Sequence, residues 1–210
     1  MTIDTMIQLL TRFGIRSDLI DGEEQDFYIH YLNLAHLELY RTVAPYIPSL
    51  VIQEEGRTVE GKLELSQNPF LILGVQNTVL RTELAKTRPE SWVSQNINPD
   101  DEGTADSYWS NGRIVQVVPR EDTFLRIYFV PFSTDLTLDT VEDEIPYPRE
   151  FHPLLIDGAL KYLQQDVDTS SIKDSTRIQR AAAEWEKGKG ELRTFIINQG
   201  GPLRVQAEYF

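Results

Sequence analysis

The sequence contains no cysteine, so neither a disulfide framework nor a thiolate metal site can form. It has only three histidines, and two of them, His30 and His36, lie six residues apart, on different faces of any helix, where they cannot share one metal ion. The start of the chain lacks the basic region of a signal peptide, and the longest apolar runs are too short to span a bilayer. We therefore expect a protein suited to a reducing compartment, without a metal, a cofactor or a membrane segment.

Motifs for catalysis are also scarce. There is no Walker loop, no dinucleotide-binding glycine pattern and no H-E-x-x-H pair. Residues 170–173 match S-x-x-K, but the companion motifs of that hydrolase class are absent, and a serine here suits a helix N-cap. Residues 98–109 match part of a calcium loop, but Trp109 stands where a bidentate glutamate is needed. We predict no catalytic, cofactor-binding or metal-binding residue.

Basic residues are in the minority, with 20 against 33 acidic residues and a net charge of −13. Such an acidic chain does not suit electrostatic binding of nucleic acid, which needs basic patches. Residues 99–150 hold twelve acids and four arginines, whereas residues 171–210 hold seven basic and five acidic residues. These segments are either ordinary solvated surfaces or two surfaces of opposite sign that suit contacts between subunits.

Amphipathic periodicity predicts helices at both ends of the chain. Apolar residues recur at helical spacing over residues 3–13, and again between Asp26, a plausible N-cap, and Pro45, which ends the pattern. A third helix is expected to begin at Pro153, after an approach made extended by two earlier prolines, and a fourth to cover residues 172–196.

The fourth predicted helix has one apolar face and a weak interior. Gly188 and Gly190 each weaken the helix by about 1 kcal/mol relative to alanine. Small residues beside Trp185 allow another helix to approach closely. The expected face consists of Ile178, Ala181, Ala182, Trp185 and Leu192.

Between the helices the pattern changes to short strands separated by glycine, asparagine and proline. Asn111-Gly112 marks a hairpin turn. In the strongest strand, Leu125, Ile127 and Phe129 point to one side and the intervening residues to the other. The strands are expected at residues 49–54, 58–65, 70–75, 78–84, 111–119 and 123–132.

These patterns predict an α+β protein: a four-helix bundle with an inserted small antiparallel β-sheet and an extended C-terminal tail. The expected parts are an N-terminal helical hairpin of the bundle (1–48), the inserted β domain (49–145), the C-terminal helices of the bundle (146–197) and the tail (198–210).

The order of these parts is accompanied by two sequence motifs. One is W-S-N-G-R-I-V-Q-V-V-P at residues 109–119, followed by L-R-I-Y-F-V-P at 125–131. The more specific one, P-x-x-F-H-x-L-L-I-x-G-A-L, covers residues 148–160. Together they resemble the head-to-tail adaptor (connector) proteins of tailed bacteriophages, and within these the chain is most similar to adaptors of the tail tubular protein A type.

The resemblance implies a structural virion protein of the head–tail junction, not an enzyme, that is assembled in the host cytoplasm. Its copies are expected to form a dodecameric ring that binds the portal protein and a tail nozzle or tail tube protein. Genomic DNA would pass through the channel on ejection without specific binding. The implied portal-docking residues of the tail are Leu203, Val205, Tyr209 and Phe210, and the implied inter-subunit residues are Arg177, Arg180, Trp185, Lys187 and Arg193.

Two alternatives remain open from the sequence. One is a tail-completion or stopper protein, whose channel plug could only be the loop at residues 96–110. The other is a virion-associated polysaccharide hydrolase that uses carboxylates of the inserted sheet.

Overall fold

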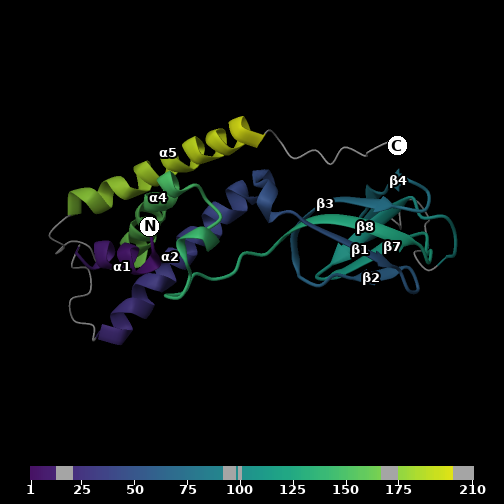
Figure 1. Ribbon diagram of the computed structural model, residues 1–210, viewed down its shortest axis with the longest axis horizontal. Helices are drawn as coiled ribbons and strands as arrows, with labels where there is room; N and C mark the ends of the chain where they lie inside the picture. The colour runs from purple at the N-terminus through teal and green to yellow at the C-terminus, as the bar shows by residue number, and fades with distance from the viewer. Residues whose placement is uncertain (13–20, 92–97, 99–100, 167–174, 201–210) are drawn as a thin grey trace. The chain divides into compact units, whose positions relative to one another are not determined.

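The computed structural model describes residues 1–12, 21–91, 98, 101–166 and 175–200. The chain divides into two compact units (Figure 1). The helical unit consists of Met1–Ile47 together with the described residues from Ser133 to Gly200, and the β unit spans Pro48–Phe132. No helix in the described ranges is long and apolar enough to cross a bilayer.

The helical unit contains α1 (Ile3–Thr11), α2 (Asp21–Val43), α4 (His152–Asp166) and α5 (Ser175–Gly200). The central element is α4, which packs on each of the other three (Figure 1). A helix covered on several sides is apolar around most of its circumference. The buried apolar residues of α4 are accordingly Leu154, Leu155, Ile156, Ala159, Leu160 and Leu163.

The predicted four-helix bundle is not matched. The three long helices α2, α4 and α5 pack on one another. The principal contacts of α1 are with α2 and α4. With nine residues, α1 is about 14 Å long, while the 26 residues of α5 extend for about 39 Å. A helix this short cannot form the fourth side of a bundle along the length of the others.

Helix α1 ends at Thr11, two residues before the predicted end, and helix α2 begins earlier than predicted. The N-cap of α1 is Thr2, whose hydroxyl accepts a hydrogen bond from the Thr5 amide. Helix α2 begins at Asp21 and not after Asp26, the predicted N-cap, so residues 21–26 are helical. Four of the six residues 21–26 are acidic, and acidic residues are favoured in the first turn by the helix dipole. At its other end α2 stops before a 3₁₀ turn, η1 (Ala44–Tyr46), as the proline there predicts.

The chain comes back from the β unit through residues 133–151, here called the return segment. It contains two 3₁₀ turns, η3 (Glu142–Glu144) and η4 (Arg149–Phe151). Ile145, which precedes a proline, has φ −74° and ψ 116°, the extended conformation that the sequence predicts. Pro153 lies in the first turn of α4, which is also as predicted.

The β unit follows a 3₁₀ turn, η2 (Pro48–Leu50), and holds two four-stranded sheets. One sheet is antiparallel in the order β1-β8-β3-β4, and the other has the order β2-β7-β6-β5, with β5 parallel to β6. The strands are β1 (Ile52–Arg57), β2 (Lys62–Glu64), β3 (Pro69–Asn77), β4 (Thr82–Glu83), β5 (Ala85–Lys86), β6 (Ser107–Asn111), β7 (Ile114–Val118) and β8 (Phe124–Pro131).

The prediction of a single antiparallel sheet is therefore wrong. The reason lies at Leu84, where the chain changes from one sheet to the other. The Leu84 amide donates to the Val75 carbonyl in the first sheet, and the Ala85 amide donates to the Asp106 carbonyl in the second. The strand predicted at 78–84 is mostly a turn, because only its end, β4, pairs with β3. Strands of two or three residues carry too little alternation to be recognised from sequence.

The core of the β unit lies between the two sheets. Leu125, Ile127 and Phe129 of β8, which were predicted to share one side of the strand, are all fully buried, so this side faces the core. Both sheets contribute to one apolar cluster of Leu65, Ile72, Val75, Leu84, Ala105, Tyr108, Val115, Val117, Leu125, Ile127 and Phe129.

Candidate interaction surfaces and the contacts that shape them

The implied docking tail lies outside the described residues. This applies to Leu203, Val205, Tyr209 and Phe210, whereas the helix that precedes them is described to its end at Gly200.

The implied inter-subunit residues lie on α5 and differ in accessibility. Arg180 is exposed, and the Lys187 side chain is 71% exposed and forms an ion pair of 3.6 Å with Glu191 on the next turn. Arg193 donates a hydrogen bond of 3.1 Å to the Tyr46 hydroxyl of η1. Arg177 belongs to α5, but its side chain lies outside the described residues. Arg180 and Lys187 therefore have accessible charged groups, whereas Arg193 links α5 to η1.

Trp185 has a different place from the one the resemblance implied. It has no exposed surface, because its ring packs against Gly158 of α4 in the core of the helical unit. The ammonium groups of Lys161 and Lys189 lie 5.9 Å and 5.4 Å from the ring centroid, close enough for cation–π contacts. Trp185 is thus a core residue that joins α5 to α4, and it offers no surface to another subunit.

A polar network lies beside this tryptophan and is here called the Glu38 cluster: Glu38, Lys161, Tyr162, Glu186 and Lys189. One carboxylate oxygen of Glu38 accepts hydrogen bonds from Lys161 Nζ at 3.0 Å and the Tyr162 hydroxyl at 2.6 Å. The other oxygen accepts from Lys189 Nζ at 2.5 Å. Glu186 lies 2.9 Å from Lys189 Nζ and 3.6 Å from Lys161 Nζ. One side chain of α2 is thereby tied to both α4 and α5.

Three groups of the Glu38 cluster have shifted pKa values. Burial alone would raise the pKa of Glu38, but the hydrogen bonds from Lys189, Tyr162 and Lys161 outweigh it and lower the pKa to about 2. Burial, followed by the hydrogen bond to Glu38, raises the pKa of Tyr162 to about 12. Burial would lower the pKa of Lys189, yet its two carboxylate partners raise it. Glu38, Tyr162 and Lys189 therefore keep their charge states near neutral pH, which suits a mechanical link between helices and not proton transfer.

Side chains of α2 also hold the return segment. The carboxamide of Asn33 pairs with the backbone of Leu136, because Asn33 Oδ1 accepts from the Leu136 amide at 2.6 Å and Nδ2 donates to its carbonyl at 3.0 Å. Further along, the Tyr147 hydroxyl lies 3.0 Å from both Nδ1 and the backbone carbonyl of buried His36. Burial lowers the pKa of His36 to about 4, so this imidazole is neutral at neutral pH.

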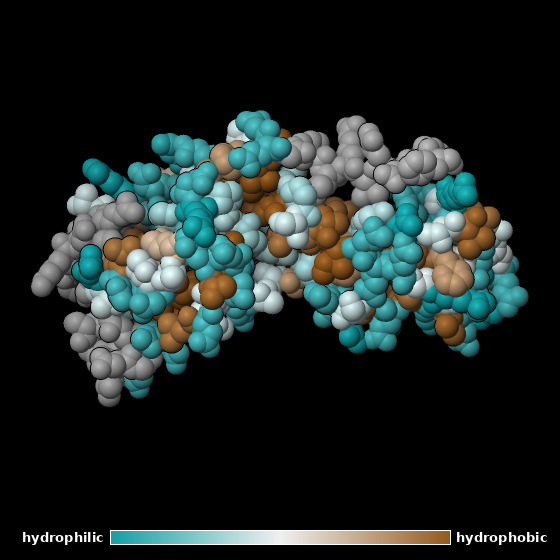
Figure 2. Space-filling model, in the orientation of Figure 1, coloured by the Kyte–Doolittle hydropathy of each residue, from teal (hydrophilic) through white to brown (hydrophobic). Residues whose placement is uncertain are grey.

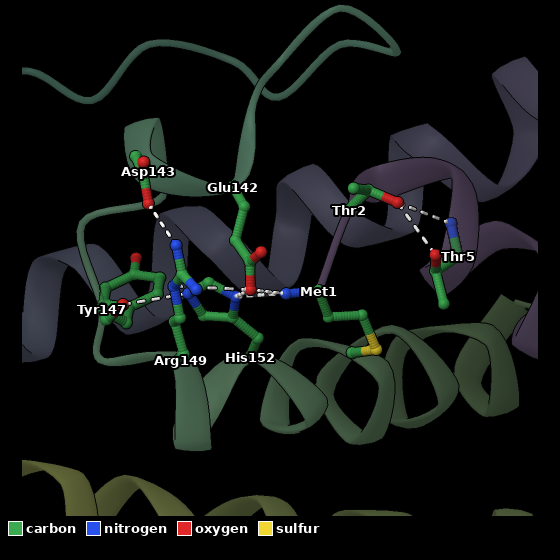
Figure 3. Close-up of polar contacts among 8 residues, drawn as sticks. All are labelled: Met1, Thr2, Thr5, Glu142, Asp143, Tyr147, Arg149 and His152. Carbon is green, nitrogen blue, oxygen red and sulfur yellow. Dashed lines mark hydrogen bonds and ion pairs between the residues drawn. The ribbon is translucent and has the colours of Figure 1, made fainter.

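A second polar group lies where the return segment meets α4 (Figure 3). His152 is buried, and its Nε2 lies 2.9 Å from the Tyr147 carbonyl, which can only accept; Nε2 therefore carries the hydrogen. Glu142 accepts from the amino group of Met1, which also lies 3.2 Å from His152 Nδ1. Arg149 donates to Asp143 at 2.8 Å. These contacts fix the turn that leads into α4.

Apolar side chains reach the surface of the β unit (Figure 2). Val79 and Leu80 are 63% and 45% exposed in the turn between β3 and β4. Their amides both donate to Asn77 Oδ1 at 3.1 Å, and the Asn77 side chain is itself fully buried. Phe124, 52% exposed, adjoins this turn, since its carbonyl accepts from the Thr78 amide. The turn thus presents apolar side chains on a backbone held by a buried carboxamide.

The carboxylates of the β unit take part in its own framework. Glu55 pairs with Arg126 across β1 and β8, and Glu121 accepts a hydrogen bond from the Ala105 amide. In the calcium-like loop, Glu102 pairs with Arg120 at 2.8 Å. Within the described ranges, no three histidine, aspartate or glutamate side chains are grouped to hold a metal ion.

Sequence reasoning missed the Glu38 cluster and the Asn33 pairing. The partners of Glu38 are 123 to 151 residues away in the sequence, and Asn33 is 103 residues from Leu136. No local spacing pattern marks such residues. The only available signal was a glutamate on a helix near the expected apolar stripe, which is common on any solvated helix.

Comparison with known proteins gives one result that covers both units. No curated protein matches the chain. The model of the SU10 adaptor protein family matches residues 1–206, that is, the helical unit, the β unit and most of the segment after α5. The subgroup implied by the sequence, the tail tubular protein A type, is not distinguished by this match. The chain belongs to the SU10 adaptor protein family and is a structural, phage adaptor-type protein of the virion.

Proposed function

We propose that this protein is the head-to-tail adaptor of a tailed phage and that its copies form a dodecameric ring beneath the portal protein. The observation that carries the proposal is the family match over residues 1–206, because it includes both units and not a single shared motif. On its far side the ring binds a tail nozzle or tail tube protein, as adaptors of the tail tubular protein A type do. The protein acts by connecting other proteins and not by catalysis.

Contacts between neighbouring copies involve the exposed side of α5. Support comes from Arg180 and Lys187, whose charged groups lie on the outer side of the helix. The complementary surface is the return segment, where Asp139, Asp143 and Glu144 are exposed. A contact between two different surfaces, repeated around a closing rotation, generates a ring. Opposite charge favours the correct partner and speeds association.

The portal is bound by the residues that follow α5. Leu203, Val205, Tyr209 and Phe210 supply apolar and aromatic groups in a short polar segment. Aromatic anchors in a groove of the partner often dominate the binding energy of an interface. Helix α5 supports such a role because it leads directly into this segment.

The DNA channel of the ring is acidic, and DNA passes through it without specific binding. The net charge of −13 per chain supports this, because a like-charged wall repels the phosphates and lets the duplex slide.

The experiment is electron microscopy of the protein mixed with portal rings of the phage that encodes it. A ring of this chain capping the portal is the expected result, and a chain that lacks residues 201–210 should keep its circular dichroism spectrum but leave the portal bare. The proposal is overturned if the full chain never associates with the portal, or if the shortened chain caps the portal as well as the full chain.

A further inference from the structure

Helix α5 contains an intrinsically weak segment, Gly188-Lys189-Gly190, near the middle of its 26 residues. Glycine in a helix interior costs about 1 kcal/mol relative to alanine, so two glycines in three residues make this the least stable part of the helix. The two glycines have different structural settings. A Cβ on Gly188 would overlap the Leu154 side chain of α4, so close packing accounts for this glycine. A Cβ on Gly190 would meet nothing within 4 Å, so packing does not account for the second one.

Between the two glycines lies the most heavily bonded cation of the Glu38 cluster. Lys189 Nζ is bound by Glu38 of α2 at 2.5 Å and by Glu186 of α5 itself at 2.9 Å. Its side chain is only 14% exposed and also contacts the Trp185 ring. The weakest backbone of α5 thus coincides with its strongest polar attachment to another helix.

The two parts of α5 on either side of this segment are held differently. The part before it is anchored by Trp185, which is fully buried between α4 and the Glu38 cluster. The part after it buries Leu192 and Ile196, and rests on the half-buried ring pair of Phe195 and Phe151, 5.3 Å apart. Most of the remaining side chains in the second part are exposed, so its position depends on these contacts and on the hydrogen bond from Arg193 to Tyr46 of η1.

We propose that Gly188-Lys189-Gly190 is a hinge within α5 and that the bond from Lys189 to Glu38 is the lock that holds it straight. When the lock is intact, the hinge residues stay helical despite their low propensity. When it opens, the part of α5 after Gly190 bends away from α4 while the part before it stays anchored by Trp185. On the proposed function, this motion reorients the point from which the portal-docking residues leave the helix.

The test is backbone hydrogen exchange, read by mass spectrometry on the full chain, in the variant Glu38→Gln. This change keeps the shape of the side chain and removes the charge that binds Lys189. Exchange should accelerate about tenfold or more at residues 189–200, and less than about threefold in α2 and at residues 176–186, because only the far part of α5 is released. The matched control is Glu191→Gln, which removes an exposed carboxylate of the same helix and should leave exchange nearly unchanged.

A second substitution separates a hinge from a general loss of stability. Gly190→Ala should slow exchange at residues 189–200 by about fivefold in the Glu38→Gln background, as expected from a propensity gain of about 1 kcal/mol, and should slow exchange in α2 much less. If Glu38→Gln does not fold, Lys189→Met opens the same lock from the other side. The hinge is refuted if Glu38→Gln raises exchange equally across α2, α4 and α5, or if Gly190→Ala slows exchange in α2 as much as at residues 189–200. All of these measurements use the protein without a portal, so their outcome is independent of whether the adaptor proposal holds.

Discussion

Gly158 of α4 lies directly against the ring of Trp185 of α5. A Cβ placed on Gly158 would be 2.7 Å from Cζ3 of the tryptophan and 2.6 Å from the Cβ of Ala35 in α2. Both distances are shorter than real Cβ contacts, and neither neighbour is the mobile end of a long side chain. The absence of one side chain therefore allows α2, α4 and α5 to meet at a single point, which is the centre of the helical unit.

This arrangement predicts that Gly158→Ala destabilises the protein even though alanine favours helix formation. Overlap in a packed core typically costs about 1–3 kcal/mol, which exceeds the propensity gain of about 1 kcal/mol. Urea unfolding followed by the circular dichroism signal of the helices should show a lower midpoint. Gly190→Ala is the matched control in the same unit and should raise the midpoint, because nothing lies near its Cβ. Equal effects of the two changes would show that the close approach is not present.

A second prediction concerns the attachment of the return segment to α2. Asn33→Ala leaves the buried backbone groups of Leu136 without their side-chain partners, which should cost about 1–3 kcal/mol in the free energy of unfolding. Hydrogen exchange at the Leu136 amide should accelerate more than exchange in α4. The control is Asn198→Ala on the exposed side of α5, which should change the stability by less than about 0.5 kcal/mol. If both substitutions behave alike, the Asn33 pairing contributes nothing to the fold.

The pH dependence of stability follows from two buried histidines. Burial lowers the pKa of His36 to about 4 and also lowers the pKa of His152. Below pH 6.5 the histidines of the unfolded chain bind protons that those of the folded chain do not. Their contribution to the free energy of unfolding is therefore fully present above pH 6.5 and is lost as the pH falls toward 4. Glu38, with a pKa of about 2 against 4.5, adds a loss between pH 4.5 and 2.

Urea midpoints measured from pH 7 to pH 4 should therefore decrease, and His36→Asn should flatten the dependence while leaving part of it to His152. Replacing the exposed His30 by asparagine is the control and should leave the slope unchanged. If the urea midpoint depends on pH equally in the unchanged protein and in His36→Asn, then a neutral buried His36 is not the source of that dependence.

Local periodicity was enough to predict the elements whose burial pattern repeats along several residues. The alternation of Leu125, Ile127 and Phe129 predicted that they share one side of β8, the side that the structure buries, and the prolines before α4 predicted its extended approach. Two-residue strands such as β4 and β5 have no such repeat, and the change of sheet at Leu84 depends on pairing with strands far along the chain. The second sheet could not be found for that reason.

Periodicity also shows which face of a helix is covered but not what covers it. Trp185 was predicted to touch another subunit, yet α4 covers it within the same chain. Gly188 was interpreted as a weakness of the helix, whereas it also provides the space for Leu154. In the motif at residues 148–160, His152 binds the Tyr147 carbonyl and Gly158 permits the three-helix contact. These two residues of the motif at residues 148–160 therefore serve the fold of the helical unit.

The last prediction addresses the proposed contact between subunits. Arg180→Glu combined with Lys187→Glu changes the net charge by −4 on the exposed side of α5 and touches no core residue. The free energy of unfolding should change by less than about 1 kcal/mol, since exposed ion pairs contribute little. Ring formation on portal particles, counted by electron microscopy, should be lost, because like charges would face each other across every subunit contact. Arg57→Glu with Lys62→Glu makes the same charge change on the β unit and should leave ring formation intact. If the β-unit pair abolishes rings as effectively as the α5 pair, total charge and not the α5 surface governs assembly.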